Sequence, residues 1–421
     1  MPPRRLHIAW IGAMPGRGDS GGVPGVATEL LHGLSALGHR IDCFFPGAKR
    51  ELPARLGEHA GLRFIWGTSA WRWDRWYNRT RIGAALSGLL SRAVASLRLR
   101  REIARRHRAD AYDLIYQFSS IESLAVPARL RRSVPLVVHP ETHSAGELRC
   151  LLAERRLSLR SQPVHVYALA LATMAARTPV QRRRIRRADL LVCISSVFRE
   201  HLVRDYRFPR ERTVVIPNPV RLERFSGVHR RLVDPPSVLV LGRVAVRKGI
   251  EDVVALARLL HERGAGVRLR VIGGPGQWSD YTPLLRALPA DSAEYVGRVH
   301  SSQIPDELAR SDVLLQASRY EPFGLTVGEA LAAGVPVVAT REVGAIEGVD
   351  SGAVAAVAPG DVEAMAGAVL AMISQVRAGP ERLSAGARAE AQRLFDPATV
   401  CAQISSAIEA LVPDAGGDGM A

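Results

Sequence analysis

Short apolar runs alternate along the chain with amphipathic segments, and this alternation predicts the fold. An apolar run at residues 6–11 leads through a glycine-rich loop into residues 23–39, whose apolar positions recur at helical spacing. A second apolar run, "RIDCFF" at residues 40–45, follows directly. A strand, a glycine loop, a helix and a second strand in this order begin a doubly wound α/β unit.

The same alternation continues to about residue 225 and begins again near residue 237. In the first stretch we expect further strands at 112–118, 135–139, 189–195 and 213–219. In the second we expect strands at 237–243, 267–274, 293–299, 312–318 and 335–340, with helices at 249–264, 282–288, 304–311 and 326–334. We therefore predict an α/β protein of two doubly wound, Rossmann-like domains, residues 1–225 and 226–395, with a ligand cleft between the carboxyl ends of their sheets.

The end of the chain differs from both domains. Residues 397–411 place apolar side chains on one face of a helix, which we assign to a separate segment at 396–412. Periodicity does not show where that helix packs. The glycine-rich residues 413–421 are expected to be disordered.

Neither the longest apolar run nor the four cysteines change this picture. The longest apolar run, residues 164–176, is shorter than the roughly 20 residues that span a bilayer, and we expect a buried helix there. The basic start of the chain leads into a Pro/Gly-rich turn, which favours a first strand over a signal peptide. The four cysteines are widely scattered, which fits a reducing compartment. We therefore expect a cytoplasmic protein.

Charge is distributed unevenly between the two halves. Residues 1–227 hold 39 Lys and Arg against 18 Asp and Glu, whereas residues 228–421 hold 18 against 23. A basic domain joined to a mildly acidic one suggests that the first faces an anionic partner, for which nucleic acid and anionic lipid are both candidates.

Two segments of the basic half leave alternatives open. "IWGTSAWRWDRWY" contains four of the six tryptophans, including Trp71 and Trp73, which can stack on sugars, sit at a membrane interface or pack on the domain. Residues 81–108 combine apolar positions at helical spacing with many arginines. This pattern suits peripheral attachment to the inner face of an anionic cell membrane, or an ordinary solvated basic helix.

The stretch "EPFGLTVGEALAAG" holds Glu321 and Glu329 with seven residues between them. On one continuous helix they would lie about 12 Å apart along the axis and point in different directions. Glycosidase carboxyl pairs lie about 5–10 Å apart and face each other, so on a continuous helix the two glutamates do not fit a hydrolase pair. A loop followed by a helix that starts near Thr326 instead leaves free N–H groups at the helix N-terminus, which is an anion site.

This interpretation makes both glutamates hydroxyl-binding groups on either side of a phosphate. Positive charge for the phosphate is available in "GRVAVRKG", from Arg243 at a strand end and Lys248 at a helix start. The chain has only two lysines against 55 arginines, so a lysine at this position suggests that a compact ammonium is needed there.

Together with "VIGGPG", "YVGRV" and the early "SGGV" loop, these motifs resemble the family-4 retaining glycosyltransferases of GT-B fold, most closely over residues 237–362. The resemblance implies a nucleotide-sugar donor held by the second domain, and a final helix that crosses back to the first. It also implies retention through front-face displacement, with no metal or other cofactor. The donor contacts that it implies are Gly21, Gly22, Arg243, Lys248, Val296, Gly297, Arg298, Glu321, Phe323, Gly324, Leu325, Thr326 and Glu329.

The resemblance distributes these contacts along the donor. Arg243 and Lys248 would hold the diphosphate, with Gly21 and Gly22 nearby, although the glycine pair also suits an ordinary strand-to-helix turn. Thr326 would bind the phosphate and Glu329 the ribose. Glu321 and the backbone of residues 323–325 would bind the sugar, and residues 296–298 would flank the base.

The acceptor side is less defined. The family has a histidine after the strand at 135–139, and we favour His143 over His139 for contact with the donor sugar. We expect His143, Arg243, Lys248 and Glu321 to act in catalysis, and His139, Glu141, Trp71 and Trp73 to face the acceptor. Pro219 and Arg221 replace the glycine and aspartate that family members often carry after "IPN".

The sequence thus predicts a bacterial, cytoplasmic glycosyltransferase that moves a sugar from a nucleotide diphosphate, UDP or GDP, to a hydroxyl acceptor. A cell-envelope glycan, a lipid-linked saccharide and a secondary metabolite all remain open as acceptors. The alternatives are another GT-B enzyme, an epimerase or a phosphorylase, and a basic nucleic-acid- or membrane-binding protein. Nucleic acid is disfavoured because the most specific motif lies in the acidic half.

Overall fold

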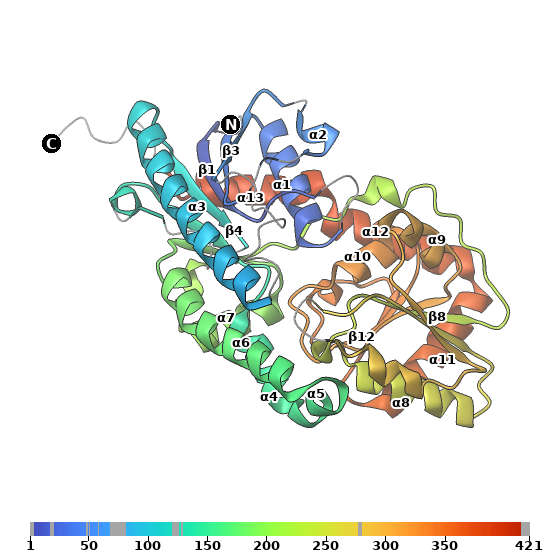
Figure 1. Cartoon of the computed structure of the whole chain (residues 1–421). Coiled ribbons are helices and arrows are strands. Elements are labelled where there is room, and N and C mark those ends of the chain that lie inside the picture. Colours follow the sequence, from blue (N-terminus) through green and yellow to red (C-terminus); the bar gives the residue numbers. More distant parts are fainter. Residues whose placement is uncertain are drawn as a thin grey trace.

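The structure is a computed structural model, and it describes most of the chain. The described residues are 4–16, 21–47, 49, 51–57, 59–67, 81–119, 126, 127, 129–276 and 280–413, with residues 81–93 described by their backbone alone. Two parallel sheets with helices around them form two facing halves, blue to green and yellow to red in Figure 1.

The first sheet has seven described strands in the order β3-β2-β1-β4-β5-β6-β7, and all its pairings are parallel. Its strands are β1 (His7–Gly12), β2 (Arg40–Phe45), β3 (Leu62–Trp66), β4 (Leu114–Phe118), β5 (Leu136–His139), β6 (Leu190–Cys193) and β7 (Thr213–Val215). Its α-helices are α1 (Val23–Ala36), α2 (Ala54–Gly57), α3 (Arg81–Ala109), α4 (Ser144–Ala153), α5 (Arg155–Ser161), α6 (Val164–Ile185) and α7 (Ser196–Tyr206). Short 3-10 turns are η2 (Leu130–Arg132), η3 (Arg210–Arg212) and η4 (Leu222–Arg224).

The second sheet has six described strands in the order β10-β9-β8-β11-β12-β13, again all parallel. Its strands are β8 (Ser237–Leu241), β9 (Arg268–Ile272), β10 (Ala293–Gly297), β11 (Val313–Gln316), β12 (Val337–Thr340) and β13 (Val354–Val357). Its helices are α8 (Ile250–Glu262), α9 (Ile304–Ala309), α10 (Leu325–Ala332), α11 (Val362–Ala378) and α12 (Pro380–Phe395). Its 3-10 turns are η5 (Val246–Lys248), η6 (Thr282–Ala287), η7 (Ser301–Gln303) and η8 (Gly344–Ile346).

The central strands are apolar on both faces because helices cover both sides of each sheet. Every residue of β1 is buried, as are all residues of β11 and β12. This is the pattern expected of a parallel sheet with two covered faces. The predicted two-domain α/β class is confirmed. Among the differences in detail, residues 282–287 form a 3-10 turn, and β3, β13, α11 and α12 were not predicted.

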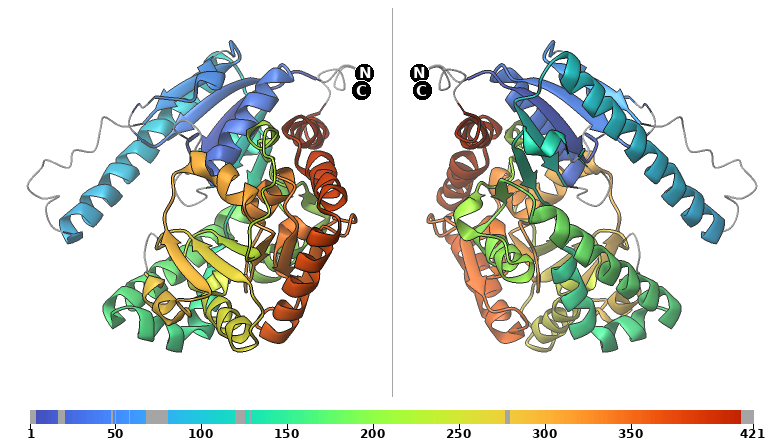
Figure 2. Two further views of the ribbon diagram at one scale, coloured as in Figure 1. Left: turned by 90° about the vertical axis from the view of Figure 1, so that its right-hand side faces the viewer. Right: turned by 90° about the vertical axis from the view of Figure 1, so that its left-hand side faces the viewer.

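The last helix, α13 (Pro397–Glu409), packs on the first domain. Its residues Val400, Cys401, Ile404 and Ile408 are fully buried in one core with β1, β2 and α1. A Cβ atom at Gly33 of α1 would lie 2.4 Å from Sγ of Cys401, so the helices approach closely where glycine leaves room. Figures 1 and 2 show this dark red helix beside the blue elements, which confirms that the C-terminal helix crosses back.

Helices of the first domain also cover part of the second. Leu157 of α5 belongs to the hydrophobic core of the second sheet. Nearby, the hydroxyls of Ser158 and Tyr281 lie 2.9 Å apart, and Nε2 of Gln162 donates to the same tyrosine at 3.2 Å. The segment expected as a buried helix at 164–176 is α6, and this expectation was wrong for one face, which is exposed.

Candidate active site

Glu321 lies between β11 and α10, at the carboxyl edge of the second sheet. Its Oε2 atom accepts a hydrogen bond of 2.8 Å from Nη1 of Arg247 and also contacts Nζ of Lys248. Burial alone would raise the pKa of Glu321, but the two cations outweigh burial and hold that pKa at about 2. Glu321 is therefore an anion at neutral pH, buried within a cluster of cations.

The helix after Glu321 begins at Leu325, one residue before the predicted start. Gly324 precedes it with φ of 99°, in the left-handed region, and a Cβ atom there would lie 2.9 Å from Cγ1 of Val343. Glycine is thus favoured on two counts, backbone conformation and space. Thr326, expected to bind phosphate, donates its hydroxyl to Oε1 of Gln316 at 3.1 Å. The first N–H groups of α10 lack intrahelical partners, as at any helix start, and their use as an anion site stays a prediction.

The loop between β8 and α8 brings three cations to this edge. Lys248 and Arg247 both contact Glu321, whereas Arg243 is exposed and has no ion pair among the described residues. Arg247 was not predicted. The chain has 55 arginines, so nothing in the sequence distinguishes the arginine beside Lys248 from the many that lie on the surface.

The turn expected to flank the base closes β10. Val296 is 39% exposed, and Gly297 has φ of 85°. Arg298 lies against the loop after β9, since a Cβ atom at Gly274 would be 2.9 Å from its Nε atom. The turn is therefore accessible on one side and braced by Arg298 on the other.

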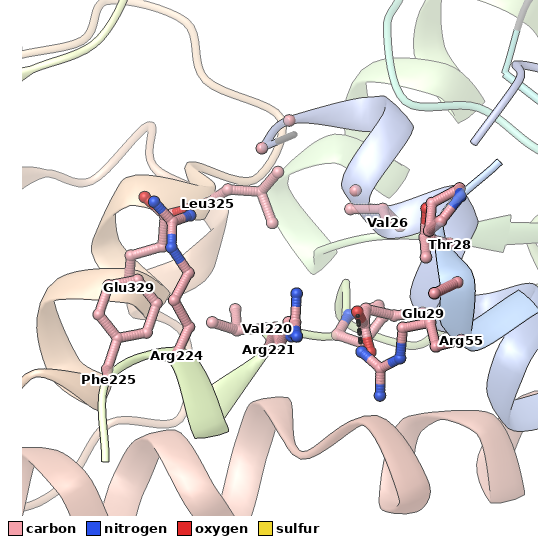
Figure 3. Close-up of a pocket in the computed structure, with 16 residues that line it drawn as sticks. Val26, Thr28, Glu29, Arg55, Val220, Arg221, Arg224, Phe225, Leu325 and Glu329 are labelled. Atoms are coloured by element: carbon pink, nitrogen blue, oxygen red, sulfur yellow. Dashed lines mark hydrogen bonds and ion pairs between the residues drawn. The ribbon is translucent and has the colours of Figure 1, made fainter. Parts of the chain in front are cut away.

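Glu329 faces a cavity of about 500 Å³ between the two domains (Figure 3). Gly21, Gly22 and Leu325 line the same cavity, and a Cβ atom at Gly21 would lie 3.8 Å from Oε1 of Glu329. The structure thus brings the predicted glycine loop and the second glutamate together. Burial raises the pKa of Glu329 to about 7, and Arg224, whose Nη1 lies 4.0 Å from Oε1, offsets only part of that effect.

Arginines from the interdomain linker enter this first cavity. Arg221 and Arg224 come from the segment after β7, and Arg55 pairs with Glu29 at 2.7 Å on the far wall. Figure 3 shows Arg221 between that pair and Glu329. The replacement at Arg221, noted as a departure from the family pattern, therefore adds a cation to the wall of the cavity.

His139, the last residue of β5, and Glu141 belong to a buried polar network and line neither the first cavity nor the second one described below, so their contact with an acceptor stays a prediction. Nδ1 of His139 lies 2.7 Å from the hydroxyl of Tyr116, and Nδ2 of Asn218 donates to Glu141 at 2.7 Å. Burial lowers the pKa of His139 to about 3 and raises that of Glu141 to about 7. Nε2 of His139 and Oε1 of Glu141, 3.5 Å apart, have no hydrogen-bond partner among the described residues.

His143 occupies a different position from His139. Its Nδ1 atom accepts from the backbone N–H of Gly146, which caps α4, and lies 3.0 Å from the hydroxyl of Tyr320. Its Nε2 atom is 3.0 Å from Asp205. The ring is fully buried and lines neither the first cavity nor the second one described below, so its catalytic assignment stays a prediction. Trp71 and Trp73 lie outside the described residues.

A second cavity, of about 240 Å³, lies where α4 and α6 meet the loops of the second sheet. Arg243 and Arg247 line it from the second domain. Glu147, Met174 and Arg177 line it from the first. Glu147 makes no ion pair within the described part of the chain. The cavity thus presents a carboxylate and guanidinium groups beside the cations at Glu321.

The domains meet along a hydrogen-bonded seam next to this site. The hydroxyl of Ser195 donates to the carbonyl of Pro322 at 2.7 Å. The carboxylate of Glu347, in the loop after η8, accepts from the N–H groups of Ser196 and Val197 at 2.7 and 2.8 Å. An anion therefore binds the N-terminus of α7 across the domain boundary, where the helix dipole favours it.

Two doubly wound domains with a C-terminal helix crossing back define a GT-B architecture, and the comparisons with known proteins agree. Residues 20–224 match the sequence profile of glycosyltransferase family 4, and residues 235–375 match that of the group 1 glycosyl transferases. The chain belongs to the group 1, family-4 glycosyltransferases.

The curated proteins that this chain resembles are named for different reactions. Mannosylfructose-phosphate synthase of Agrobacterium fabrum is 29% identical over 40% of this chain and 41% of its own length. Glycogen synthase of Mycobacterium tuberculosis is 31% identical over 51% of this chain and 53% of its own length. The chain thus spans about half the length of these two relatives. D-inositol 3-phosphate glycosyltransferase of Geodermatophilus obscurus is 27% identical over 90% of this chain and 82% of its own length.

Solved structures show the same fold at low sequence identity. The superposition on sucrose-phosphate synthase from Thermosynechococcus elongatus covers 97% of this chain and 99% of that protein's chain, with a TM-score of 0.65 and 20% identity. Anabaena HepE in complex with UDP and glucose covers 96% of this chain and 100% of its own, with a TM-score of 0.59 and 18% identity.

Proposed function

We propose that the protein transfers a sugar from a nucleotide diphosphate sugar to a hydroxyl acceptor, with retention and without a metal. The observation that carries this proposal is the cluster at Glu321, where two partly buried cations and the start of α10 surround one buried carboxylate. Fixed donors at this point suit a diphosphate leaving group, because its negative charge grows in the transition state. HepE, of the same fold, is known in complex with UDP-glucose, which supports a donor of this class.

In the proposed reaction the bond between the anomeric carbon and the β-phosphate oxygen breaks, and a bond from that carbon to the acceptor oxygen forms on the same face. The acceptor proton passes to the departing diphosphate. Arg243, Arg247 and Lys248 would hold the diphosphate, and Glu321 would bind sugar hydroxyls. Glu329 would bind the ribose in the first cavity.

The second cavity is our candidate for the acceptor, since it adjoins Arg243 and is walled by the basic first domain. Its guanidinium groups suit an anionic acceptor group, and Glu147 suits a hydroxyl. The name of the D-inositol 3-phosphate glycosyltransferase relative supports including that compound among the acceptors tested.

The first test measures thermal shifts with UDP, GDP, ADP and dTDP sugars, then transfer with the donor that binds. Lys248→Ala should reduce the transfer rate by about 10²–10³-fold, by analogy with the loss of one oxyanion donor. Glu329→Ala should weaken donor binding by about tenfold, since a hydrogen bond to the ribose is lost.

The chain offers a matched control, because Lys49 is its only other lysine and is exposed. Lys49→Ala should leave both measurements unchanged. The proposal fails if Lys248→Ala and Glu329→Ala behave like Lys49→Ala. Donor turnover without any acceptor would indicate an epimerase, and turnover with phosphate alone a phosphorylase. NMR of the product gives its anomeric configuration, and activity in a chelator tests metal independence.

A further inference from the structure

The exposed face of α6 is apolar along most of the helix, unlike the outer face of an ordinary surface helix. An unbroken stripe of exposed residues carries no fixed charge, and it consists of His165, Ala168, Leu169, Ala172, Ala175, Ala176, Pro179 and Val180. Leu169 is 60% exposed and Val180 is 41% exposed. Charged side chains normally occupy such a face, so the α6 stripe requires an explanation.

Basic residues surround the stripe. It ends in three exposed arginines, Arg183, Arg186 and Arg187. Residues 155–188 contain nine arginines and no aspartate or glutamate. On the neighbouring α4 and α5, Leu152 and Leu159 are also exposed, by 50% and 46%.

We propose that the α6 stripe and its arginines form the surface by which the protein docks on an anionic membrane. An apolar face about 22 Å long with a basic end is the arrangement of helices that lie in the bilayer interface. The apolar side chains would enter the boundary between headgroups and acyl chains, and the arginines would bind anionic headgroups. Within the described part of the chain, no helix is long and apolar enough to cross a membrane.

Two other occupants fit less well. A second copy using the same surface would bring the arginine-rich ends of both copies near an uncharged interface with no acid to neutralise them. Nucleic acid would engage the arginines but would leave the alanine, leucine and valine side chains without an apolar partner. The bilayer interface satisfies both parts of the surface.

This surface lies beside the second cavity. The inner face of α6 contributes Ala170, Met174 and Arg177 to that cavity, so docking would place it about one helix diameter, some 10 Å, from the bilayer. The membrane proposal does not depend on the transfer reaction, because it rests on the outer face of the helix alone.

The test is cosedimentation of the full chain with vesicles of phosphatidylcholine alone and of an equal mixture with phosphatidylglycerol. We expect binding to the mixed vesicles that weakens as salt is raised. Leu169→Glu/Val180→Glu should reduce this binding at least about tenfold, because it puts charge into the apolar stripe. Arg183→Glu/Arg186→Glu/Arg187→Glu should reduce it about a hundredfold or more, because the cationic end is reversed.

Matched controls come from the second domain. Leu232 is an exposed leucine and Arg382 an exposed arginine, and Leu232→Glu and Arg382→Glu should bind vesicles as the native chain does. Circular dichroism and size-exclusion chromatography check that each variant folds. The proposal is overturned if the native chain binds neither vesicle, or if the stripe variants bind like the controls. A native dimer that Leu169→Glu/Val180→Glu converts to a monomer, without vesicle binding, would overturn it in favour of self-association.

Discussion

Glu321 and Glu329 lie on one loop and helix, yet their surroundings move their pKa values in opposite directions. Glu321 touches two cations, whereas Glu329 is partly buried, and Nη1 of Arg224 lies 4.0 Å from its Oε1 atom. The pKa of Glu321 is held at about 2 and that of Glu329 is raised to about 7. The first is a permanent anion, and the second titrates near neutral pH.

This difference predicts how stability depends on pH at Glu329. Between pH 4.5, its ordinary pKa, and about 7, the unfolded chain ionises this group while the folded protein keeps it protonated. The contribution of the group to stability is therefore fully present below pH 4.5 and lost as pH rises through 7. The loss is about 3 kcal/mol at pH 8 by the usual conversion of pKa into free energy.

Glu329→Gln should remove this loss, and so raise the free energy of unfolding at pH 8 relative to the native protein while changing it little at pH 5. Urea unfolding at the two pH values, followed by circular dichroism, measures the difference. Glu363→Gln, at an exposed glutamate, is the control and should show no such pH-dependent gain. An equal effect of Glu329→Gln at both pH values would contradict the assignment.

Also at the residue scale, site residues could be predicted from the sequence only where their residue type is rare in the chain or where they belong to a recognisable motif. Lys248 was found because lysine is rare here, and Glu321 and Glu329 because glycines and a helix start separate them. Arg224 and Arg247 were missed because arginine is common throughout the chain. Asn218 was missed because its contact with Glu141 joins residues 77 positions apart, which no local pattern reveals.

At the scale of elements, the start of α10 depends on one residue. Gly324 has both a left-handed φ and a close neighbour in Val343. Gly352 has a similar φ of 75°, but nothing lies within 4 Å of the Cβ atom it would gain. Comparing alanine substitutions at Gly324 and Gly352 therefore separates the cost of backbone strain, which both share, from the cost of a steric clash, which only Gly324 has.

Gly324→Ala should destabilise the protein by about 2–4 kcal/mol, the sum of backbone strain and overpacking. Gly352→Ala should cost only the strain, about 1 kcal/mol. Urea unfolding measures both. Donor binding should fall in Gly324→Ala alone, because a shifted helix start moves its N–H groups. Equal losses of stability in the two variants would show that Val343 does not limit the space at Gly324.

Elements were predicted well where apolar runs were bounded by turn residues, as at β1 and β11. β3 was missed because its residues, 62–66, are half-exposed and run into the tryptophan-rich segment, which hides their period. The helix at 164–176 was expected to be buried because its residues are apolar on all sides. Hydrophobicity alone does not distinguish a core partner from the exposed stripe that the structure shows.

At the scale of the whole molecule, the seam at α7 determines how the domains meet. Glu347 comes from the second domain, while the N–H groups that it accepts from, on Ser196 and Val197, belong to the first. These contacts exist only when the domains are closed, because separation would return both partners to water. A ligand that binds between the domains therefore shifts the balance between the closed and open arrangements, toward whichever arrangement it binds more tightly.

Glu347→Ala should shift the domains toward an open arrangement. Loss of two charge-assisted hydrogen bonds at a helix N-terminus is worth about 1–2 kcal/mol, or about five- to thirtyfold in the open-to-closed ratio. Hydrogen exchange should accelerate at the start of α7, and small-angle scattering should show a larger radius of gyration.

Asp361 gives a matched control, since its carboxylate accepts from the N–H of Ala364 at 2.9 Å within the second domain alone. Asp361→Ala should fray α11 without opening the domains. A Glu347→Ala protein with unchanged scattering and exchange at α7 would show that the apolar contacts of the seam hold it closed without this glutamate.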